Sequence, residues 1–396
     1  MKMLRNLLKC YPAVLATAMA VSCGHSSISM NRVAARTDRS DTIVVNYSDT
    51  AILALQDCID SVKYVVLESN AECPIGYVDA VYFTDSSIVV VDYRIASSVY
   101  LFGYDGKFRG RVSQPGNGPH EYLNLTYVTL SHDSRMIVIQ DRQKDKVMWF
   151  DMNGKYCRST DGTANGGDVE YVAENCLIHE TDAVGGISRP NDHSSFVATD
   201  STNGYLYSVC QQQYSSKMKA MYGHPLKRQG SRIIGRRVAD NSIYEFTETG
   251  PEIIHYVKII PDDFSGYKYE DTDSFFKGQR LHQSLDENFI ETDSYSYFSV
   301  SQDYQQDYLY SHSDRKLYRL KTRFNRLILG FFFRPITSLN NDWMVSVSEP
   351  FVIYGLANQF PNLEQMDEEL YGLKQKISLD DNPVIFFYHI KKDIQP

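Results

Sequence analysis

The hydrophobic positions of this chain form many short runs separated by turn residues, and two of these stretches repeat each other. Residues 85–104 and 133–152 align at a constant offset of 48 residues, which places Arg94 opposite Arg142. Short apolar runs that are bounded by glycine, asparagine and aspartate predict β-strands. A repeat of roughly 40–50 residues that is built from short strands is typical of a propeller blade. The pattern therefore predicts an all-β propeller.

The first repeat is predicted to hold four antiparallel strands, which cover Gly76–Phe83, Ile88–Tyr93, Val99–Tyr104 and Phe108–Val112. Asp105-Gly106 in this repeat and Asn153-Gly154 in the next are dipeptides that accept the positive φ angles of a tight hairpin. Weaker strand signals predict further blades, the last of which begins with Leu327–Phe333 and Trp343–Ser348. The acidic, tyrosine-rich segment Asp262–Gln283 is expected to be a long loop between blades.

Two predicted strands at opposite ends of the chain have no neighbour in sequence. Val62–Leu67 lies before the first blade, and Pro383–Ile390 is the last strand. A propeller leaves two open sheet edges unless the chain ends share one blade, so we expect these two strands to pair. At 48 residues per repeat plus loops, the roughly 330 residues from Val62 to Ile390 predict six blades of four antiparallel strands, in a domain spanning residues 51–396.

One helix is predicted near the C-terminus of this β-rich chain, over residues 362–378. Apolar side chains recur there at spacings of three and four residues, at Leu363, Met366, Leu370, Leu373 and Ile377. Such a stripe on one helical face can dock a partner protein, or it can pack against the flank of the chain's own propeller. We favour packing against the propeller, because amphipathic helices of folded domains generally bury their apolar face in the core.

The N-terminus has the features of an export signal. Basic residues are followed by a short apolar run, Ala13–Val21, and then by a cysteine, Cys23. The run is too short to span a bilayer as a helix. Small residues directly before a cysteine resemble the bacterial lipoprotein signal, and an ordinary secretory signal is the alternative. We therefore expect a signal peptide over residues 1–22, and lipidated Cys23 with a flexible tether over residues 23–50. The expected location is the bacterial cell envelope, anchored to the outer membrane and facing the periplasm.

Composition limits the partners and cofactors that we expect. The net charge is −9 and no basic cluster stands out, so nucleic acid is not an expected partner. No cysteine and histidine spacing typical of zinc sites occurs, and no nucleotide-binding or hydrolase motif, so no metal or cofactor is expected. Beyond Cys23 the chain has five cysteines, and the sequence leaves their pairing open: Cys58, Cys73, Cys157, Cys176 and Cys210.

Several segments together match one family pattern: Asp60–Glu68, Cys73–Gly76, Val89–Asp92, Tyr100–Phe102, Gly116–Tyr122 and Asp380–Val384. The loop Gly116–Tyr122 reads GNGPHEY, and GxGPxEY between two blades is the most specific part. The chain thereby resembles the family of secreted six-bladed β-propeller lipoproteins, relatives of the NHL-repeat propellers. The resemblance is close over residues 51–155, weak from there to residue 320, and close again at the C-terminus. It implies the fold and the lipid anchor, and it supplies no catalytic residues.

The candidate binding residues lie on one predicted rim of the propeller. In a four-stranded blade, the loops between the second and third strands leave from the same face as the crossings to the next blade. Arg94 and Arg142 begin two such loops, and His120 and Glu121 lie in the first crossing. The arginines could bind a carboxylate or sulfate group, or each could pair with the aspartate beside it in sequence. His120 and Glu121 could act as acid and base, although Glu121 is expected to accept N–H groups of its own turn.

Three functions are compatible with these features. The leading hypothesis is a lipid-anchored envelope module that binds a ligand or acts as a scaffold, the ligand being a glycan or an acidic glycan fragment. The alternatives are a hydrolase, lyase or lactonase with carboxylates and a metal around the channel, and a structural partner of an envelope protein complex. Asp79 is the one acidic residue in the predicted inner strand of the first repeat, which favours binding over catalysis.

Overall fold

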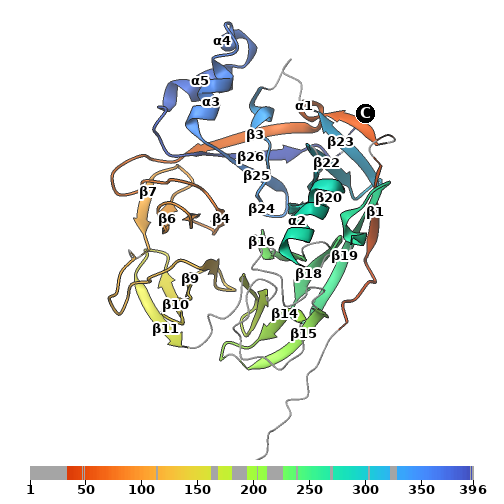
Figure 1. The fold of residues 1–396 in the computed structure, drawn as a ribbon. Helices are drawn as coiled ribbons and strands as arrows, with labels where there is room; N and C mark the ends of the chain where they lie inside the picture. The colour runs from red at the N-terminus through yellow and green to blue at the C-terminus, as the bar shows by residue number, and fades with distance from the viewer. Residues whose placement is uncertain are drawn as a thin grey trace, which may run out of the picture. The chain divides into compact units, whose positions relative to one another are not determined.

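Six β-sheets form a ring within the compact unit Asn31–Pro396 (Figure 1). The computed structural model describes residues 34–394, apart from residues 47, 49, 113–114, 162–167, 181–193, 203, 212–225, 238–239, 268–270, 302–303, 322–327 and 393. The predicted signal peptide and Cys23 therefore lie outside the described residues. Each of the six sheets contains four antiparallel strands, so the prediction of an all-β, six-bladed propeller is confirmed.

In blades 1 to 5 the four antiparallel strands follow one another in the chain, from the inner strand to the outer strand. Blade 1 consists of β4 (Ala80–Phe83), β5 (Ile88–Asp92), β6 (Ser98–Phe102) and β7 (Phe108–Arg111). Blade 2 consists of β8 (Tyr127–Leu130), β9 (Met136–Asp141), β10 (Lys146–Asp151) and β11 (Tyr156–Asp161). Blade 3 consists of β12 (Val169–Ala173), β13 (Cys176–Glu180), β14 (Ser194–Thr199) and β15 (Tyr205–Gln211).

The second half of the ring repeats this arrangement. Blade 4 consists of β16 (Leu226–Gln229), β17 (Arg232–Arg236), β18 (Ser242–Thr247) and β19 (Gly250–Ile260). Blade 5 consists of β20 (Ser284–Glu291), β21 (Tyr295–Ser301), β22 (Gln305–Ser311) and β23 (Lys316–Lys321). Blade 6 consists of β24 (Thr337–Leu339), β25 (Trp343–Ser348), β26 (Val384–Ile390) and β3 (Ile59–Val66).

Blade 6 closes the ring because it is built from both ends of the chain. Strand β3 pairs antiparallel with β26, from Val66 opposite Val384 to Ile59 opposite Ile390. The predicted first strand of this blade is wrong: residues 328–332 form a 3₁₀-helix (η2, Ile328–Phe332), and the inner strand is β24. The sequence alone does not show that β24 is the strand and residues 328–332 the helix. The aromatic residues of the helix resemble a buried strand more than the three residues of β24 do.

Two strands near the N-terminus extend blades 4 and 5 beyond the four predicted strands. Strand β1 (Asp41–Asn46) pairs parallel with β19, and β2 (Ala51–Ala54) pairs parallel with β23. The prediction of a flexible tether up to residue 50 is therefore wrong for residues 41–46. Ile43 and Val45 are buried in the hydrophobic cluster between blades 4 and 5, and these two alternating positions are too short a pattern to be recognised alone.

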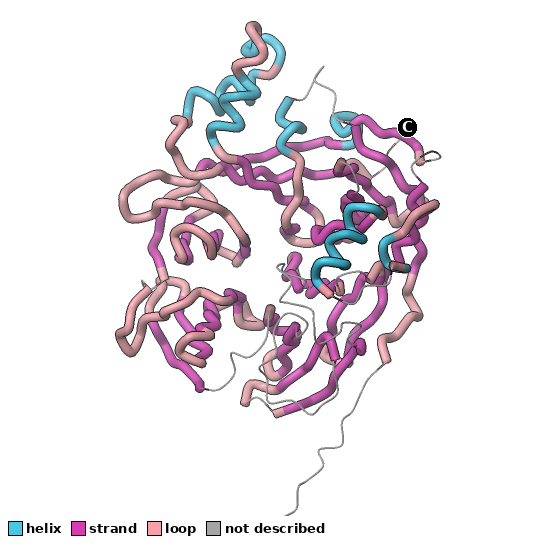
Figure 2. Tube along the Cα trace, viewed as in Figure 1, coloured by secondary structure: helices cyan, strands magenta, loops and turns pink. Residues whose placement is uncertain are grey.

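The helical regions also differ from the predictions. The predicted helix over residues 362–378 is divided at Asp367 into α4 (Leu363–Met366) and α5 (Glu368–Lys376), and α3 (Pro350–Ala357) precedes them. These helices extend beyond the edge of blade 6 (Figure 2), and the predicted stripe is buried there except for Met366. The predicted loop over residues 262–283 contains η1 (Phe264–Gly266) and α2 (Thr272–Leu281), while α1 (Leu55–Cys58) precedes β3.

Most of the hydrophobic core lies between neighbouring blades. Between blades 1 and 2, for example, Val89 and Leu101 pack in one cluster with Val128 and Ile137. Four cysteines whose side chains are described are free thiols: Cys58, Cys73, Cys157 and Cys176. Buried side chains on the two faces of a blade pack against the neighbouring blades and hold the blades together. The inner strands of the blades line the channel.

Candidate functional site

A cavity of about 190 Å³ lies at the mouth of the central channel. Its wall includes the starts of inner strands β4, β8, β16 and β24, together with Asn288 of β20 and the loop after β5. Inner strands of five blades therefore meet around it, at the face where these strands begin. This is the face on which the sequence predicted the ligand-binding rim.

Arg94 reaches this cavity and is held there by Asp79. Arg94 Nε lies 2.7 Å from Asp79 Oδ1, and the guanidinium stacks over the ring of Tyr77 at 4.6 Å. Asp79 is almost fully buried, and its Oδ2 also accepts the N–H of Tyr93. Asp92, the sequence neighbour that could have paired with Arg94, instead accepts backbone N–H groups at the start of the blade. Two-thirds of the Arg94 side chain stays exposed, so it can still contact a ligand.

Arg142 lies at the matching position of blade 2, but it does not line the cavity. Its own backbone N–H donates to Thr126 Oγ1. The adjacent Asp141 is buried and accepts backbone N–H groups from Leu123, Gln143 and Lys144. Among the described ion pairs none joins Arg142 to Asp141, so the expected neighbouring pair is absent here as well. The structure brings Arg94, and not Arg142, to the channel.

His120 and Glu121 form part of a loop and lie outside the cavity wall. Glu121 Oε2 accepts the N–H of Gly118 at 2.8 Å, as expected for a carboxylate that holds its own turn. Lys144 also stabilises this loop, because its Nζ donates to the carbonyl oxygens of Gly118 and Glu121. The exposed His120 ring stacks on Tyr156 with its centroid 4.2 Å away. A role for this pair in ligand binding stays a prediction.

Below the cavity lies a buried carboxylate that the sequence analysis missed. Glu170 of β12 accepts hydrogen bonds from Thr129 Oγ1 at 2.5 Å and Tyr127 Oη at 3.1 Å, and from Arg228 Nε at 3.2 Å. Burial raises the pKa of Glu170, although the charge of Arg228 opposes the shift. Burial also raises the pKa of Tyr127 well above its usual range, so its hydroxyl remains a neutral donor. A glutamate within an apolar strand was the available sequence signal.

Cationic side chains predominate in the cavity wall. Arg94, Lys227 and Arg228 contribute positive charge, whereas Asp79 is the single carboxylate among the lining residues. Lys227 Nζ contacts Asn288 Oδ1, which places the ammonium group at the wall between blades 4 and 5. Arg94 and Arg228 are paired with Asp79 and Glu170. The excess positive charge therefore comes from Lys227, and such an excess in a low-dielectric cavity attracts anions. The site can therefore bind a carboxylate, sulfate or phosphate group.

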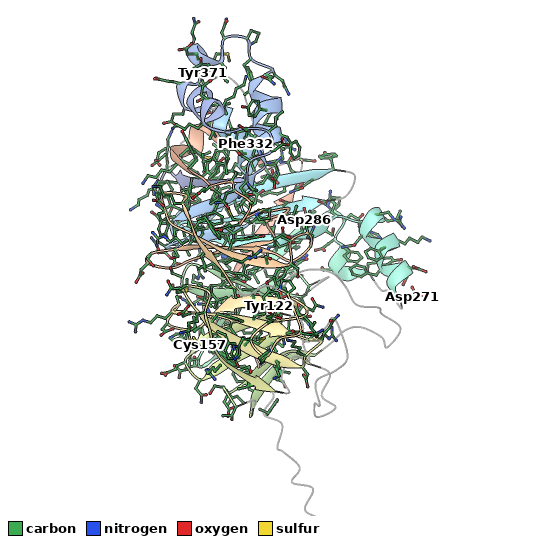
Figure 3. All side chains as sticks on the ribbon, turned by 90° about the vertical axis from the view of Figure 1, so that its left-hand side faces the viewer. Tyr122, Cys157, Asp271, Asp286, Phe332 and Tyr371 are labelled. Carbon is green, nitrogen blue, oxygen red and sulfur yellow. The ribbon has the colours of Figure 1, made fainter. Side chains whose placement is uncertain are left out.

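A groove of about 720 Å³ adjoins this cavity and shares two wall residues with it, Asn288 and Ile336. Helix α2 borders the groove, contributing Phe276, which is about half exposed. Arg334 supplies an exposed cation on another side of the groove. Figure 3 shows the segment with Asp271 projecting to one side of the ring. A capping box between Asp271 and Ser274 starts α2.

A third group of polar side chains lies between blades 4 and 5. His255, Glu291 and His312 are the group that could hold a metal ion among the described residues. Burial alone would raise the pKa of Glu291, but hydrogen bonding and the nearby charges of His255, His312 and Arg232 outweigh it and lower the pKa. The sequence does not reveal this group, since its members are separated by 36 and 21 positions along the chain and meet only in the ring.

A family model covers most of the chain. The model described as a domain of unknown function, DUF4934, matches residues 40–389. The protein belongs to the DUF4934 family. That description assigns no activity to the DUF4934 domain, so it leaves binding and catalysis equally open. No curated protein matches the chain.

A solved structure shares the fold of this DUF4934 protein. The "Putative exported protein" from Bacteroides fragilis NCTC 9343 matches with a TM-score of 0.69 and 15% identity, over 89% of this chain and 99% of that chain. A member of the duf4221 family from Bacteroides vulgatus ATCC 8482 matches with a TM-score of 0.49 and 10% identity, over 84% and 97% of the two chains. The first match shows the fold alone. Among the described helices, none is both long and apolar enough to cross a membrane.

Proposed function

We propose that this protein is an exported, lipid-anchored propeller of the cell envelope that binds an anionic glycan, or an acidic glycan fragment, at the mouth of its channel. The observation that supports this most directly is the cavity in which Arg94 is fixed by Asp79 beside Lys227 and Arg228. A carboxylate of a sugar acid would replace water around these cations, and the planar guanidinium of Arg94 can donate two parallel hydrogen bonds to it.

The neighbouring groove gives room for the rest of a chain-like ligand. The cavity alone, at about 190 Å³, is smaller than the roughly 300–1,000 Å³ of typical small-molecule sites. With the adjoining 720 Å³ groove, the site reaches that range. The acidic end of the ligand would enter the cavity, while Phe276 and Tyr77 offer aromatic faces to the apolar faces of sugar rings.

Export and lipid attachment are supported by the N-terminal sequence. A basic stretch, an apolar run and small residues precede Cys23, and a similar solved structure is described as a "Putative exported protein". Replacing Cys23 tests the anchor directly. Cys23→Ser is expected to move the protein from the membrane fraction to the soluble fraction, whereas Cys10→Ser within the signal should leave it in membranes. If the Cys23→Ser protein stays in membranes, the lipid anchor is wrong.

Ligand binding is tested with two oligosaccharides of equal length. The full chain, purified in mild detergent, is titrated by calorimetry with tetragalacturonate, which carries carboxylates, and with neutral maltotetraose. We expect binding of tetragalacturonate that weakens as salt is added, because exposed charge pairs are screened. Equal affinity for the two sugars, or no binding to either, would contradict an anionic glycan as the ligand.

A further inference from the structure

Four polar side chains from two blades converge in the interface between blades 4 and 5. His255 comes from β19, Glu291 and Ser296 from β20 and β21, and His312 follows β22. Glu291 Oε1 lies 3.2 Å from His255 Nε2 and 3.4 Å from His312 Nε2. Ser296 Oγ lies 2.8 Å from His312 Nε2 and 3.3 Å from His255 Nε2. Both imidazoles therefore direct the same nitrogen, Nε2, at one carboxylate.

The protonation of His312 is constrained by its other nitrogen. His312 Nδ1 lies 3.1 Å from the carbonyl oxygen of Asp293, which can only accept a hydrogen bond. The Nδ1 atom therefore carries a proton, and in a neutral ring the lone pair is on Nε2. That lone pair faces the carboxylate of Glu291 at 3.4 Å, so either a second proton on the ring or a bound cation must lie between the two acceptors. A carbonyl partner on the far nitrogen is also the usual way in which proteins orient a metal-binding histidine.

The His255 ring is also held through its Nε2 atom. The ring is buried, and its hydrogen bonds to the described residues run from Nε2 to Glu291 and Ser296. The Nδ1 atom has no hydrogen-bond partner among the described residues. Nε2 is thus the nitrogen that His255 directs at the carboxylate, as His312 does, and it is the atom that would bind an ion.

The spacing of the three ligand atoms agrees with coordination of one small ion. Zinc bonds to nitrogen and oxygen of about 2.0–2.2 Å, at tetrahedral angles, separate two ligand atoms by roughly 3.3–3.6 Å. The two distances from Glu291 Oε1, 3.2 and 3.4 Å, are close to this value. All three candidate ligand atoms lie within 4.8 Å of one another. Two imidazoles and a carboxylate are ligands that zinc accepts, and the Ser296 hydroxyl orients the carboxylate by donating to Glu291 Oε2 at 2.6 Å.

A network of ion pairs surrounds the polar group. Arg232 contacts both Glu291 and Glu245, and Arg39 contacts Glu245 and Glu252. Arg36 adds a further positive charge beside Glu252. Three carboxylates thus face three guanidinium groups, and with neutral imidazoles the charges of this network balance.

We propose that His255, Glu291 and His312 bind a divalent transition-metal ion of the zinc type, which clamps blade 4 to blade 5. One ligand comes from blade 4 and two come from blade 5, so the ion stabilises the folded ring and has little affinity for the unfolded chain. The site lies away from the residues that line the channel cavity. It is therefore independent of the proposed anionic ligand.

Zinc titration of the full chain tests this site. The protein, without a histidine tag and stripped with a chelator, is titrated with Zn²⁺ alone and its thermal unfolding is followed. We expect one ion per chain and a Tm that rises by roughly 3–5 °C at a hundredfold excess over Kd. His312→Gln should weaken binding at least 100-fold and abolish the rise. His282→Gln is the matched control, because His282 also lies beside a carboxylate, Asp262, but has no second histidine there.

Cobalt supplies a second measurement that does not require any variant to fold. Co²⁺ bound by two imidazoles and a carboxylate in tetrahedral geometry should give strong visible ligand-field bands, without the near-ultraviolet charge-transfer band that thiolate ligands produce. Thiolate bands would assign the ion to a cysteine such as the exposed Cys157 and would overturn the proposal. A wild-type protein that neither binds Zn²⁺ nor shows cobalt bands would overturn it as well.

Discussion

Arg94 Nε and Asp79 Oδ1 form a 2.7 Å ion pair that joins the loop after β5 to the residue just before inner strand β4. Because Asp79 is nearly inaccessible to solvent and also accepts the N–H of Tyr93, it cannot follow the arginine away from the channel. The pair thus fixes the base of the Arg94 side chain while its exposed guanidinium edge faces the cavity. Such prior positioning reduces the entropy that a ligand contact would cost.

This relationship predicts different results for the two arginines that the sequence repeat makes equivalent. Arg94→Ala should reduce tetragalacturonate affinity by about tenfold or more, since a charge-assisted hydrogen bond contributes about 1.5–3 kcal/mol. Arg142→Ala should leave affinity unchanged, because Arg142 does not line the cavity. Calorimetric titration of both variants measures the difference. An equal loss in both variants would place the ligand elsewhere on the rim.

The buried carboxyl group of Glu170 predicts a pH dependence of stability. Burial raises its pKa in the folded state above the usual 4.5, so the folded protein keeps the proton at pH values where the unfolded chain has released it. Wild-type stability should therefore fall as the pH rises from 4.5 through the folded-state pKa. Glu170→Gln lacks this ionisation, and its stability relative to wild type should increase with pH over that interval.

Urea unfolding at a series of pH values measures this effect. Tyr127→Phe is a suitable comparison, because it keeps the carboxyl group but removes a hydrogen bond that lowers the pKa of Glu170, so stability should still fall with pH and the fall should extend to higher pH. A stability difference between wild type and Glu170→Gln that does not change with pH would show that the Glu170 pKa is not raised.

Asn382 is predicted to be essential for closing the ring. Its side chain is buried and donates to the carbonyl oxygens of Glu68 and Cys73, while its Oδ1 accepts the N–H of Ile75. Asn382→Leu would leave these backbone groups without partners, at a cost of about 1–3 kcal/mol each when fully buried. We expect a loss of about 2–4 kcal/mol in the free energy of unfolding.

Denaturant unfolding gives this value, and Asn362→Ala provides the control. Asn362 is exposed, and its side chain makes no capping hydrogen bond to α4, so its replacement should change stability by less than about 0.5 kcal/mol. If both substitutions had the same small effect, the segment before β26 would not contribute to closure.

The regular parts of the fold were predictable from sequence, whereas the parts that line the channel were not. Blades 1 and 2 combine buried apolar strands with Asp-Gly and Asn-Gly turns, so local chemistry and tertiary position agree. Inner strand β16 reads LKRQ and was missed, because Lys227 and Arg228 face the channel and interrupt the hydrophobic pattern. The cavity cations and the proposed metal-binding group come from different blades and are brought together only when the blades pack against one another.

The glycine that recurs in the turns of blades 1 and 2 also lies against the neighbouring blade. Gly106 and Gly154 occupy equivalent hairpins with φ of +79° and +77°. A Cβ atom at Gly106 would lie 2.0 Å from the carbonyl oxygen of Val66, the last residue of the outer strand of blade 6. At Gly154 it would lie 2.4 Å from that of Arg111, the last residue of the outer strand of blade 1. Each hairpin thus touches the outer strand of the preceding blade.

Alanine at either position should therefore destabilise the protein for two reasons. The left-handed backbone costs an L-residue roughly 1–2 kcal/mol, and the blades must separate to admit the methyl group. We expect Gly106→Ala and Gly154→Ala each to lower the free energy of unfolding by about 2 kcal/mol or more. Gly110→Ala should be tolerated, since its Cβ would meet no atom closer than 3.6 Å and its φ is not positive. Similar losses in all three variants would mean that the hairpin glycines serve only as flexible residues.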